Sequence, residues 1–213
     1  MNTNPSPLSL KVIWAVLAVL FLASLGWLSY GNYAAGSEPW QMVASTVILS
    51  IPLGLLYFSI GLLATAREEK RSQGRLGERL AKTIYRVPRF GGILICLFVG
   101  LFALDVFTAG PSFWQMLGAF LIHALPALGI AVLLALAWRR PLIGCLAFAA
   151  AALYFMRFML GSPLQGIGIG LIFSGPLAAI ALLFWADWRW VSRAAPAGPP
   201  SHSASFPTGP TPG

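Results

Sequence analysis

The sequence predicts an all-α fold, a polytopic membrane bundle of six transmembrane helices arranged as three parallel-oriented helical hairpins. Composition is the first reason: 9% of the 213 residues are charged and 58% are hydrophobic, with a mean hydropathy of +0.78. Soluble domains carry about 25% charged residues. The second reason is length, since a bilayer core about 30 Å thick needs about 20 apolar residues per helix. Six stretches meet this requirement: residues 12–30, 40–66, 91–109, 113–138, 141–160 and 166–187.

The positions of the basic residues predict the topology. Eight arginines and lysines fall between the second and third stretches, two between the fourth and fifth, and two after the sixth, while Lys11 precedes the first. The opposite loops hold Glu38 and no basic residue, with Arg157 at the end of the fifth stretch as the exception. Because Lys and Arg accumulate on the cytoplasmic side, both termini are expected in the cytoplasm, with the chain in the cytoplasmic (inner) membrane. The net charge of +8 then faces an anionic inner leaflet and not nucleic acid.

Residues 1–11 form a short polar lead, and residues 12–66 are expected to form the first transmembrane hairpin. Trp14 marks its inner boundary and Trp27 its outer one, where amphipathic rings prefer to lie. A cleaved signal peptide is the rival interpretation of the first helix. The apolar run is longer than the usual 7–15 residues and ends without a clean cleavage site, so the sequence favours retention.

Residues 67–89 are expected to form a basic amphipathic cytoplasmic loop. Leu76, Leu80 and Ile84 recur every four residues, and the pattern predicts a helix that ends at Pro88. Such a helix would lie on the inner leaflet with its basic side chains against lipid headgroups. A solvated connecting helix explains the pattern equally well. The candidate headgroup contacts are Arg75, Arg79, Lys82 and Arg86.

Residues 90–187 are expected to form a four-helix transmembrane core, followed by a disordered cytoplasmic tail, residues 188–213, rich in Pro, Gly and Ser. A spacing of seven and then four residues connects a glutamine, an isoleucine and a proline at three places in the chain. This repeat predicts three hairpins in parallel orientation around a pseudo-threefold axis. Its members are Gln41, Ile48 and Pro52; Gln115, Ile122 and Pro126; and Gln165, Ile172 and Pro176.

The repeated prolines are predicted to kink their helices near the middle of the membrane. Proline cannot donate to the carbonyl four residues back, so each repeated isoleucine loses a backbone partner. A free carbonyl in hydrocarbon is costly unless a serine, a histidine or water donates to it. Two interpretations stay open. The kinks either shape a close-packed bundle, or they form a ring of carbonyls that lines a small cavity with the glutamines at its outer mouth.

Three polar side chains are predicted to meet in one layer near the outer ends of the core helices. With a rise of 1.5 Å per residue, Asp105, Gln115 and Arg157 each lie roughly 6–8 Å below the outer links. Asp105 and Arg157 are expected to form either a buried structural ion pair or a gate that faces the outside. His123 lies about 10 Å deeper. It is either a neutral side chain bonded to a carbonyl or to Ser174, or a proton relay.

Motifs for bond chemistry are missing from the sequence. No cluster has metal-ligand spacing, and no Ser-His-Asp arrangement is supported, so neither a cofactor nor a metal is expected. The segments Val87-Pro-Arg-Phe90, Phe102-Ala-Leu-Asp-Val-Phe107 and Ile122-His-Ala-Leu-Pro126 resemble a group of small uncharacterised prokaryotic integral-membrane proteins, a domain of unknown function. The resemblance covers roughly residues 84–187 and implies no mechanism.

These observations favour a non-enzymatic accessory or scaffold subunit of a membrane, held by a buried Asp105–Arg157 pair. The alternative is a small transporter or channel-like carrier with a polar path through Gln115, Asp105 and His123. A lipid-modifying enzyme would want clustered carboxylates or histidines at one boundary, which the sequence lacks. Expected partners are the bilayer and either another membrane protein or a second copy of the chain.

Overall fold

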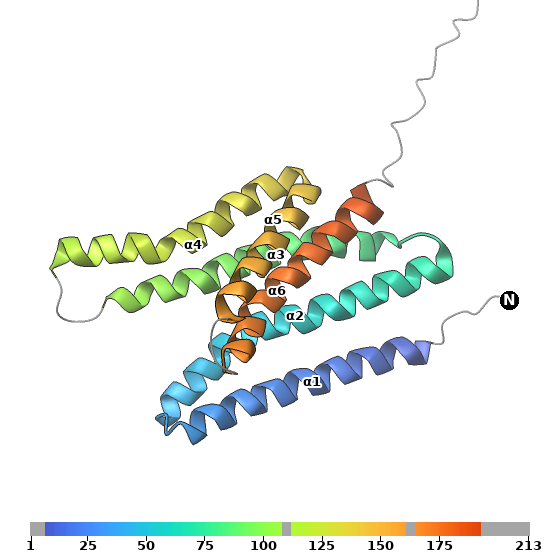
Figure 1. Ribbon diagram of the computed structural model, residues 1–213. Coiled ribbons are helices and arrows are strands. Elements are labelled where there is room, and N and C mark those ends of the chain that lie inside the picture. The colour runs from blue at the N-terminus through green and yellow to red at the C-terminus, as the bar shows by residue number, and fades with distance from the viewer. Residues whose placement is uncertain (1–6, 108–111, 161–164, 193–213) are drawn as a thin grey trace, which may run out of the picture.

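The structure, a computed structural model, is a bundle of six α-helices with two short additional helical turns (Figure 1). It describes residues 7–107, 112–160 and 165–192. The all-α prediction is confirmed for this part of the chain, which holds no strand. The elements are α1 (Pro7–Ala34), α2 (Pro39–Gln73), α3 (Glu78–Leu101), the 3-10 turn η1 (Phe102–Val106), α4 (Phe113–Arg139), α5 (Pro141–Leu160), α6 (Gln165–Ala186) and the π-helical turn η2 (Asp187–Ser192).

Four of the helices are long and apolar enough to cross a membrane. They are the segments Leu10–Ala34, Pro39–Gln73, Glu78–Leu104 and Phe113–Arg139, and a shorter apolar helix covers Pro141–Arg157. The number of six spans, their orientation and the threefold hairpin arrangement stay predictions.

Local sequence explains where several helices begin and end. Ser112 precedes α4, and its backbone N–H donates to Oε1 of Gln115 at 3.2 Å, which completes a capping box. The N–H of Glu38 donates in the same way to Gln41 at 3.2 Å at the start of α2. At the other end of α2, Gly74 adopts a left-handed conformation (φ 72°) and donates to the carbonyl of Lys70 at 3.0 Å. Each cap satisfies backbone groups that a helix terminus leaves unpaired.

The predicted helix end at Pro88 is wrong, because α3 passes through this proline without a break. An internal proline removes one backbone hydrogen bond and costs about 3 kcal/mol. Burial compensates here, since Ile84 and Pro88 are both fully buried. Leu76, Leu80 and Ile84 pack against α2 and α6, so protein covers this apolar stripe. The four predicted headgroup residues of this segment are exposed, and their contact with lipid stays a prediction.

The predicted disorder from residue 188 onward is wrong for its first five residues. Trp190 and Val191 pack against the cluster that holds Leu62, Ile84 and Leu183, so η2 covers the bundle at the end where α2 joins α3. The remainder of the predicted tail, residues 193–213, and the lead, residues 1–6, lie outside the described residues.

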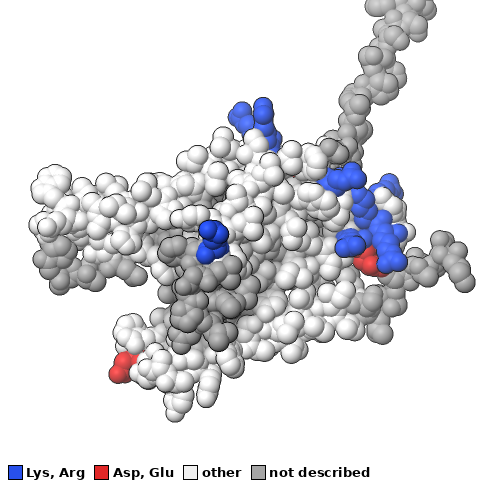
Figure 2. Space-filling view, viewed as in Figure 1, with Lys and Arg blue, Asp and Glu red and all other residues white. Residues whose placement is uncertain are grey.

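Charged side chains gather at the two ends of the molecule. Figure 2 shows Lys and Arg concentrated over the turn that joins α2 to α3, and acidic atoms at the opposite end of α2. Glu38 lies at that opposite end, where it caps α2. Between these ends the visible face is mostly white, with separate blue groups near its centre and at its upper edge. This distribution matches the charge asymmetry on which the predicted topology depends.

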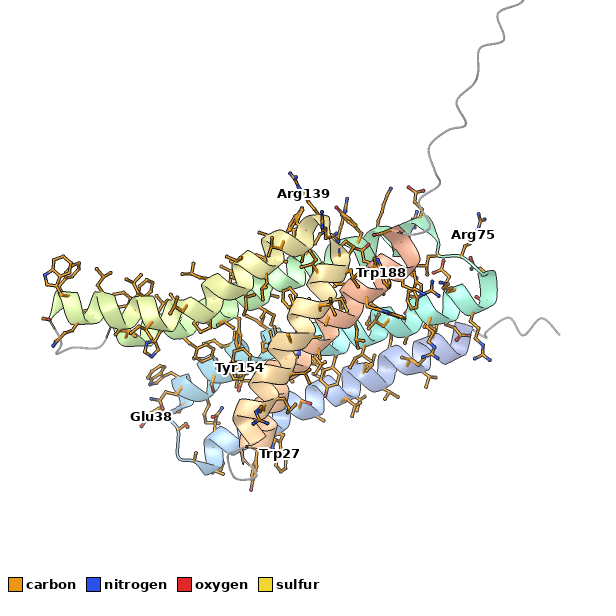
Figure 3. All side chains as sticks on the ribbon, turned by 45° about the horizontal axis from the view of Figure 1, so that its top comes forward. Trp27, Glu38, Arg75, Arg139, Tyr154 and Trp188 are labelled. Carbon is orange, nitrogen blue, oxygen red and sulfur yellow. The ribbon has the colours of Figure 1, made fainter. Side chains whose placement is uncertain are left out.

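Large apolar side chains project from every helix of the bundle (Figure 3), and α1 and α4 bury few of theirs. Leu17 is the one buried side chain among the described residues of α1, and α4 buries Ala127, Ile130, Leu134 and Ala137. The main core lies between α3, α4, α5 and α6, with Phe148 stacked on Phe184 at a centroid distance of 5.7 Å. The hairpin of α1 and α2 is joined by side-chain hydrogen bonds, such as Trp14 Nε1 to Thr65 at 3.2 Å. Interhelical hydrogen bonds of this kind stabilise helix pairs in lipid.

Candidate functional site

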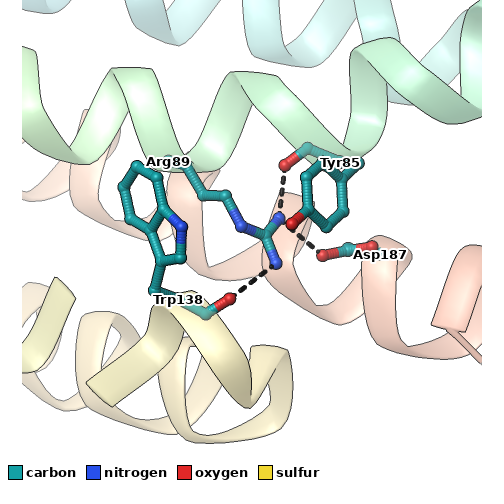
Figure 4. A network of polar contacts seen from close by, with 4 residues as sticks. All are labelled: Tyr85, Arg89, Trp138 and Asp187. Atoms are coloured by element: carbon teal, nitrogen blue, oxygen red, sulfur yellow. Dashed lines mark hydrogen bonds and ion pairs between the residues drawn. The ribbon is translucent and has the colours of Figure 1, made fainter. Parts of the chain in front are cut away.

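The best-defined polar site is a buried ion pair between α3 and η2 (Figure 4). Nη1 of Arg89 donates to Oδ2 of Asp187 at 2.8 Å. Asp187 is 0% exposed and Arg89 is 3% exposed, so the pair is shielded from solvent on all sides. An isolated charge in such surroundings is costly, and a close partner is what makes both charges tolerable.

Arg89 also completes the end of a second helix. Its Nη2 donates to the backbone carbonyl of Trp138 at 3.2 Å, and its Nη1 donates to the carbonyl of Tyr85 one turn back in α3. Trp138 is the next-to-last residue of α4, where carbonyls have no partner within the helix. A cation at a helix C-terminus is also favoured by the helix dipole. One guanidinium therefore connects α3, α4 and η2.

Aromatic side chains enclose the guanidinium. Its Cζ lies 3.7 Å from the centroid of the Tyr85 ring and 5.7 Å from that of Phe184. Arginine stacks well on aromatic rings because its planar cation is attracted to their faces. Both terminal nitrogens of the guanidinium donate hydrogen bonds, whereas Nε has no partner among the described atoms. The arrangement is suited to fixing helix positions and leaves the pair little room for a substrate.

Sequence reasoning missed this pair. Arg89 was assigned to the basic loop and Asp187 to the end of the last apolar stretch. One signal was available, because both residues lie at the predicted inner boundary, and Asp187 is the one acid at the end of a core stretch on that side. Arg89 also belongs to the segment Val87-Pro-Arg-Phe90, one of those that carried the family resemblance.

The predicted pair of Asp105 and Arg157 stays a prediction. Arg157 is exposed near the end of α5, and it forms no ion pair with a side chain that the structure describes. The backbone of Asp105 lies in η1, but its side chain is outside the described part. Of the three residues predicted to form the outer polar layer, only Arg157 and Gln115 have side chains that the structure describes. Gln115 is exposed and caps its own helix.

His123 lies on the exposed face of α4. Its Nδ1 is 2.8 Å from the carbonyl oxygen of Ala119, one turn earlier in the same helix. A carbonyl oxygen only accepts, so this contact assigns the proton to Nδ1. The histidine thus has the carbonyl-bonded arrangement that was one of its two predicted interpretations. Its partner is local, and Ser174 lies buried on α6 with its hydroxyl unpaired among the described atoms.

The repeated prolines lie inside their helices, which continue past each of them. Pro52 and Pro176 are buried, whereas Pro126 is exposed on α4. Among the described side chains, none of the predicted donors bonds to these carbonyls: Ser50 donates to Val47 at 2.7 Å, His123 bonds to Ala119, and Ser174 is unpaired. The glutamines of the repeat have a local explanation at the first two sites, where they complete capping boxes. The side chain of Gln165 is outside the described part, and the duplication itself stays a prediction.

A metal centre is not found among the described side chains, where no three His, Cys, Asp or Glu residues lie close enough to hold an ion. Cys96 and Cys145 are free thiols, and Cys96 donates to the carbonyl of Ala127 at 3.2 Å.

Fold and site together define an all-α bundle with several membrane-length apolar helices and a buried ion pair at one end. The chain matches, over residues 77–197, the family described as a domain of unknown function, DUF7670. This match covers more than half of the sequence, so the chain belongs to that family. The matched segment includes both Arg89 and Asp187 and excludes the hairpin of α1 and α2. No curated protein and no solved structure matches the chain.

Proposed function

We propose that this protein is a multi-pass inner-membrane protein with both termini in the cytoplasm, and that it acts as a non-enzymatic accessory or scaffold subunit. The apolar faces of α1 and α4 support the membrane location, since a soluble protein rarely leaves such large contiguous apolar surfaces exposed. The concentration of basic residues at one end of the bundle supports the orientation.

One observation supports the accessory role: four of the described polar side chains bond to helices of the bundle itself. Arg89 and Asp187 connect three elements within a closed aromatic environment. Gln115 caps the helix on which it lies, and His123 bonds to a carbonyl of that same helix. In a carrier, such groups would converge on a path through the bundle. Here each of them has a partner within the bundle, and the histidine and the glutamine bond only to residues of α4 or its N-cap.

The test begins with extraction of membranes at high pH, which releases peripheral proteins and retains integral ones. The retained protein is then isolated from its native host in mild detergent, and its mass is measured. An accessory subunit is expected to elute with a partner protein in a fixed ratio.

Reconstituted vesicles provide the opposing measurement. A His123→Leu variant and a matched Leu121→Ile variant on the same helix are compared with the wild type for proton-linked solute flux. Equal background rates in all three agree with the accessory role. If the wild type shows flux and only the histidine variant abolishes it, the accessory role is wrong and the protein is a carrier.

A further inference from the structure

A groove with a polarity gradient opens between the inner ends of α2 and α6. Its volume is about 590 Å³, and its lining comprises Leu63, Ala64, Arg67, Leu182, Trp185 and Trp190. The groove is separate from the buried ion pair, because none of its lining residues belongs to that site.

The two walls of the groove change from apolar to basic and aromatic in the same direction. On α2, Leu63 is followed by Arg67 and Lys70 at spacings of four and three, which place them on one face of the helix. On the other wall, Leu182 is followed by Trp185 and then by Trp190 of η2. Both helices run toward the basic end of the bundle. The apolar part of the groove therefore lies deeper in the predicted membrane than the cationic part.

Lys70 lies next to the groove, where it contacts the lining residue Trp190. Its Nζ lies 5.2 Å from the centroid of the Trp190 ring, and no described acid forms an ion pair with it. Arg67 is exposed beside it. The nearest acids along the chain, Glu68 and Glu69, are not among the lining residues, and Glu69 instead accepts the N–H of Gly77 at 2.7 Å. Two cations thus stand at the entrance without a carboxylate in the lining.

We propose that this groove binds one anionic phospholipid of the inner leaflet. The phosphate would lie between Arg67 and Lys70, the glycerol region beside the indole rings, and an acyl chain along Leu63 and Leu182. Basic pockets between helices at the cytoplasmic side suit anionic headgroups, and Trp prefers the depth of the glycerol region. The inference rests on the proposed membrane location and is independent of the accessory role.

A second apolar groove extends the surface available to the lipid tail. It has a volume of about 500 Å³ and runs along α5 and α6, and it shares Leu182 and Trp185 with the first groove. The two grooves therefore adjoin at Leu182 and Trp185, so a lipid with its headgroup beside Arg67 could place acyl chains in both.

The experiment uses the full chain in detergent micelles and measures bound lipid by native mass spectrometry. Wild type is expected to bind dioleoyl phosphatidylglycerol at least tenfold more tightly than dioleoyl phosphatidylcholine, and inorganic phosphate is not expected to compete. The variant Arg67→Gln/Lys70→Gln is expected to lose roughly ten- to thirtyfold in affinity for phosphatidylglycerol, because each basic residue near an anionic surface contributes roughly fivefold. Arg75→Gln/Arg79→Gln removes the same charge from exposed sites outside the groove and is expected to bind like wild type.

Equal losses of phosphatidylglycerol affinity in the two charge-removing variants would overturn the proposal, because they would indicate diffuse attraction to the basic surface. Competition by inorganic phosphate would also overturn it, because the site would then bind a free anion and not a lipid. A second measurement needs no charge-removing variant. Acyl-brominated phosphatidylglycerol is expected to quench the fluorescence of wild type more than acyl-brominated phosphatidylcholine, and Trp185→Phe/Trp190→Phe should remove that difference. Equal quenching by the two lipids would overturn the lipid site and leave the proposed membrane location standing. A chain that high pH extracts from membranes would instead overturn the proposed membrane location.

Discussion

Removal of one partner of the buried ion pair is expected to destabilise the bundle severely. In Asp187→Asn, the guanidinium of Arg89 keeps its charge but loses the carboxylate that lies 2.8 Å away in a solvent-free environment. Breaking a buried pair in this way costs about 3–5 kcal/mol. For a chain of this size each kcal/mol lowers the melting temperature by about 2–4 °C, so a decrease of about 6–20 °C is expected. Loss of circular dichroism on heating in mild detergent measures it.

The double variant Arg89→Met/Asp187→Leu is expected to recover most of that loss, since apolar residues of similar volume often replace buried pairs at little cost. The carbonyl of Tyr85 keeps its helical N–H donor, whereas that of Trp138 loses the side-chain donor, which costs about 1 kcal/mol. As a control, Glu78→Gln breaks the exposed pair with Lys82 and is expected to cost roughly 0.3–0.5 kcal/mol. A double variant as unstable as Asp187→Asn, or a single variant as stable as wild type, would refute this reasoning.

Two further predictions concern packing and the outer layer. Gly144→Ala is expected to cost about 1–3 kcal/mol, because a Cβ there would lie 2.8 Å from that of Ala137, whereas Gly129→Ala meets open space and should be nearly neutral. The same thermal assay measures both, and equal melting temperatures would contradict the close approach. If Asp105 and Arg157 form the predicted pair, Asp105→Arg and Arg157→Asp should each lower stability and their combination should restore it. Additive losses in the double variant would exclude the pair.

Local chemistry made much of the fold predictable. A chain with few charges and long apolar runs must pair its backbone groups internally, and helices achieve this within each segment. Helix ends followed from nearby residues in the same way, as in the capping box of Ser112 with Gln115 and the left-handed Gly74. Gln115 shows that a repeated position does not by itself indicate a function. Its position in the repeat suggested a role in a polar path, but its local hydrogen bond at the start of α4 explains that position.

The sequence by itself determined that the chain is an apolar helical bundle with its basic residues at one end, because composition, periodicity and caps act within a few residues. Only the tertiary structure decided which polar groups meet. Arg89 and Asp187 are 98 positions apart, and no local pattern connects them. Tertiary packing also carried α3 through Pro88, since the burial of Ile84 and its neighbours outweighs the lost hydrogen bond. Burial depends on which distant helices pack together, and a local sequence pattern does not contain that information.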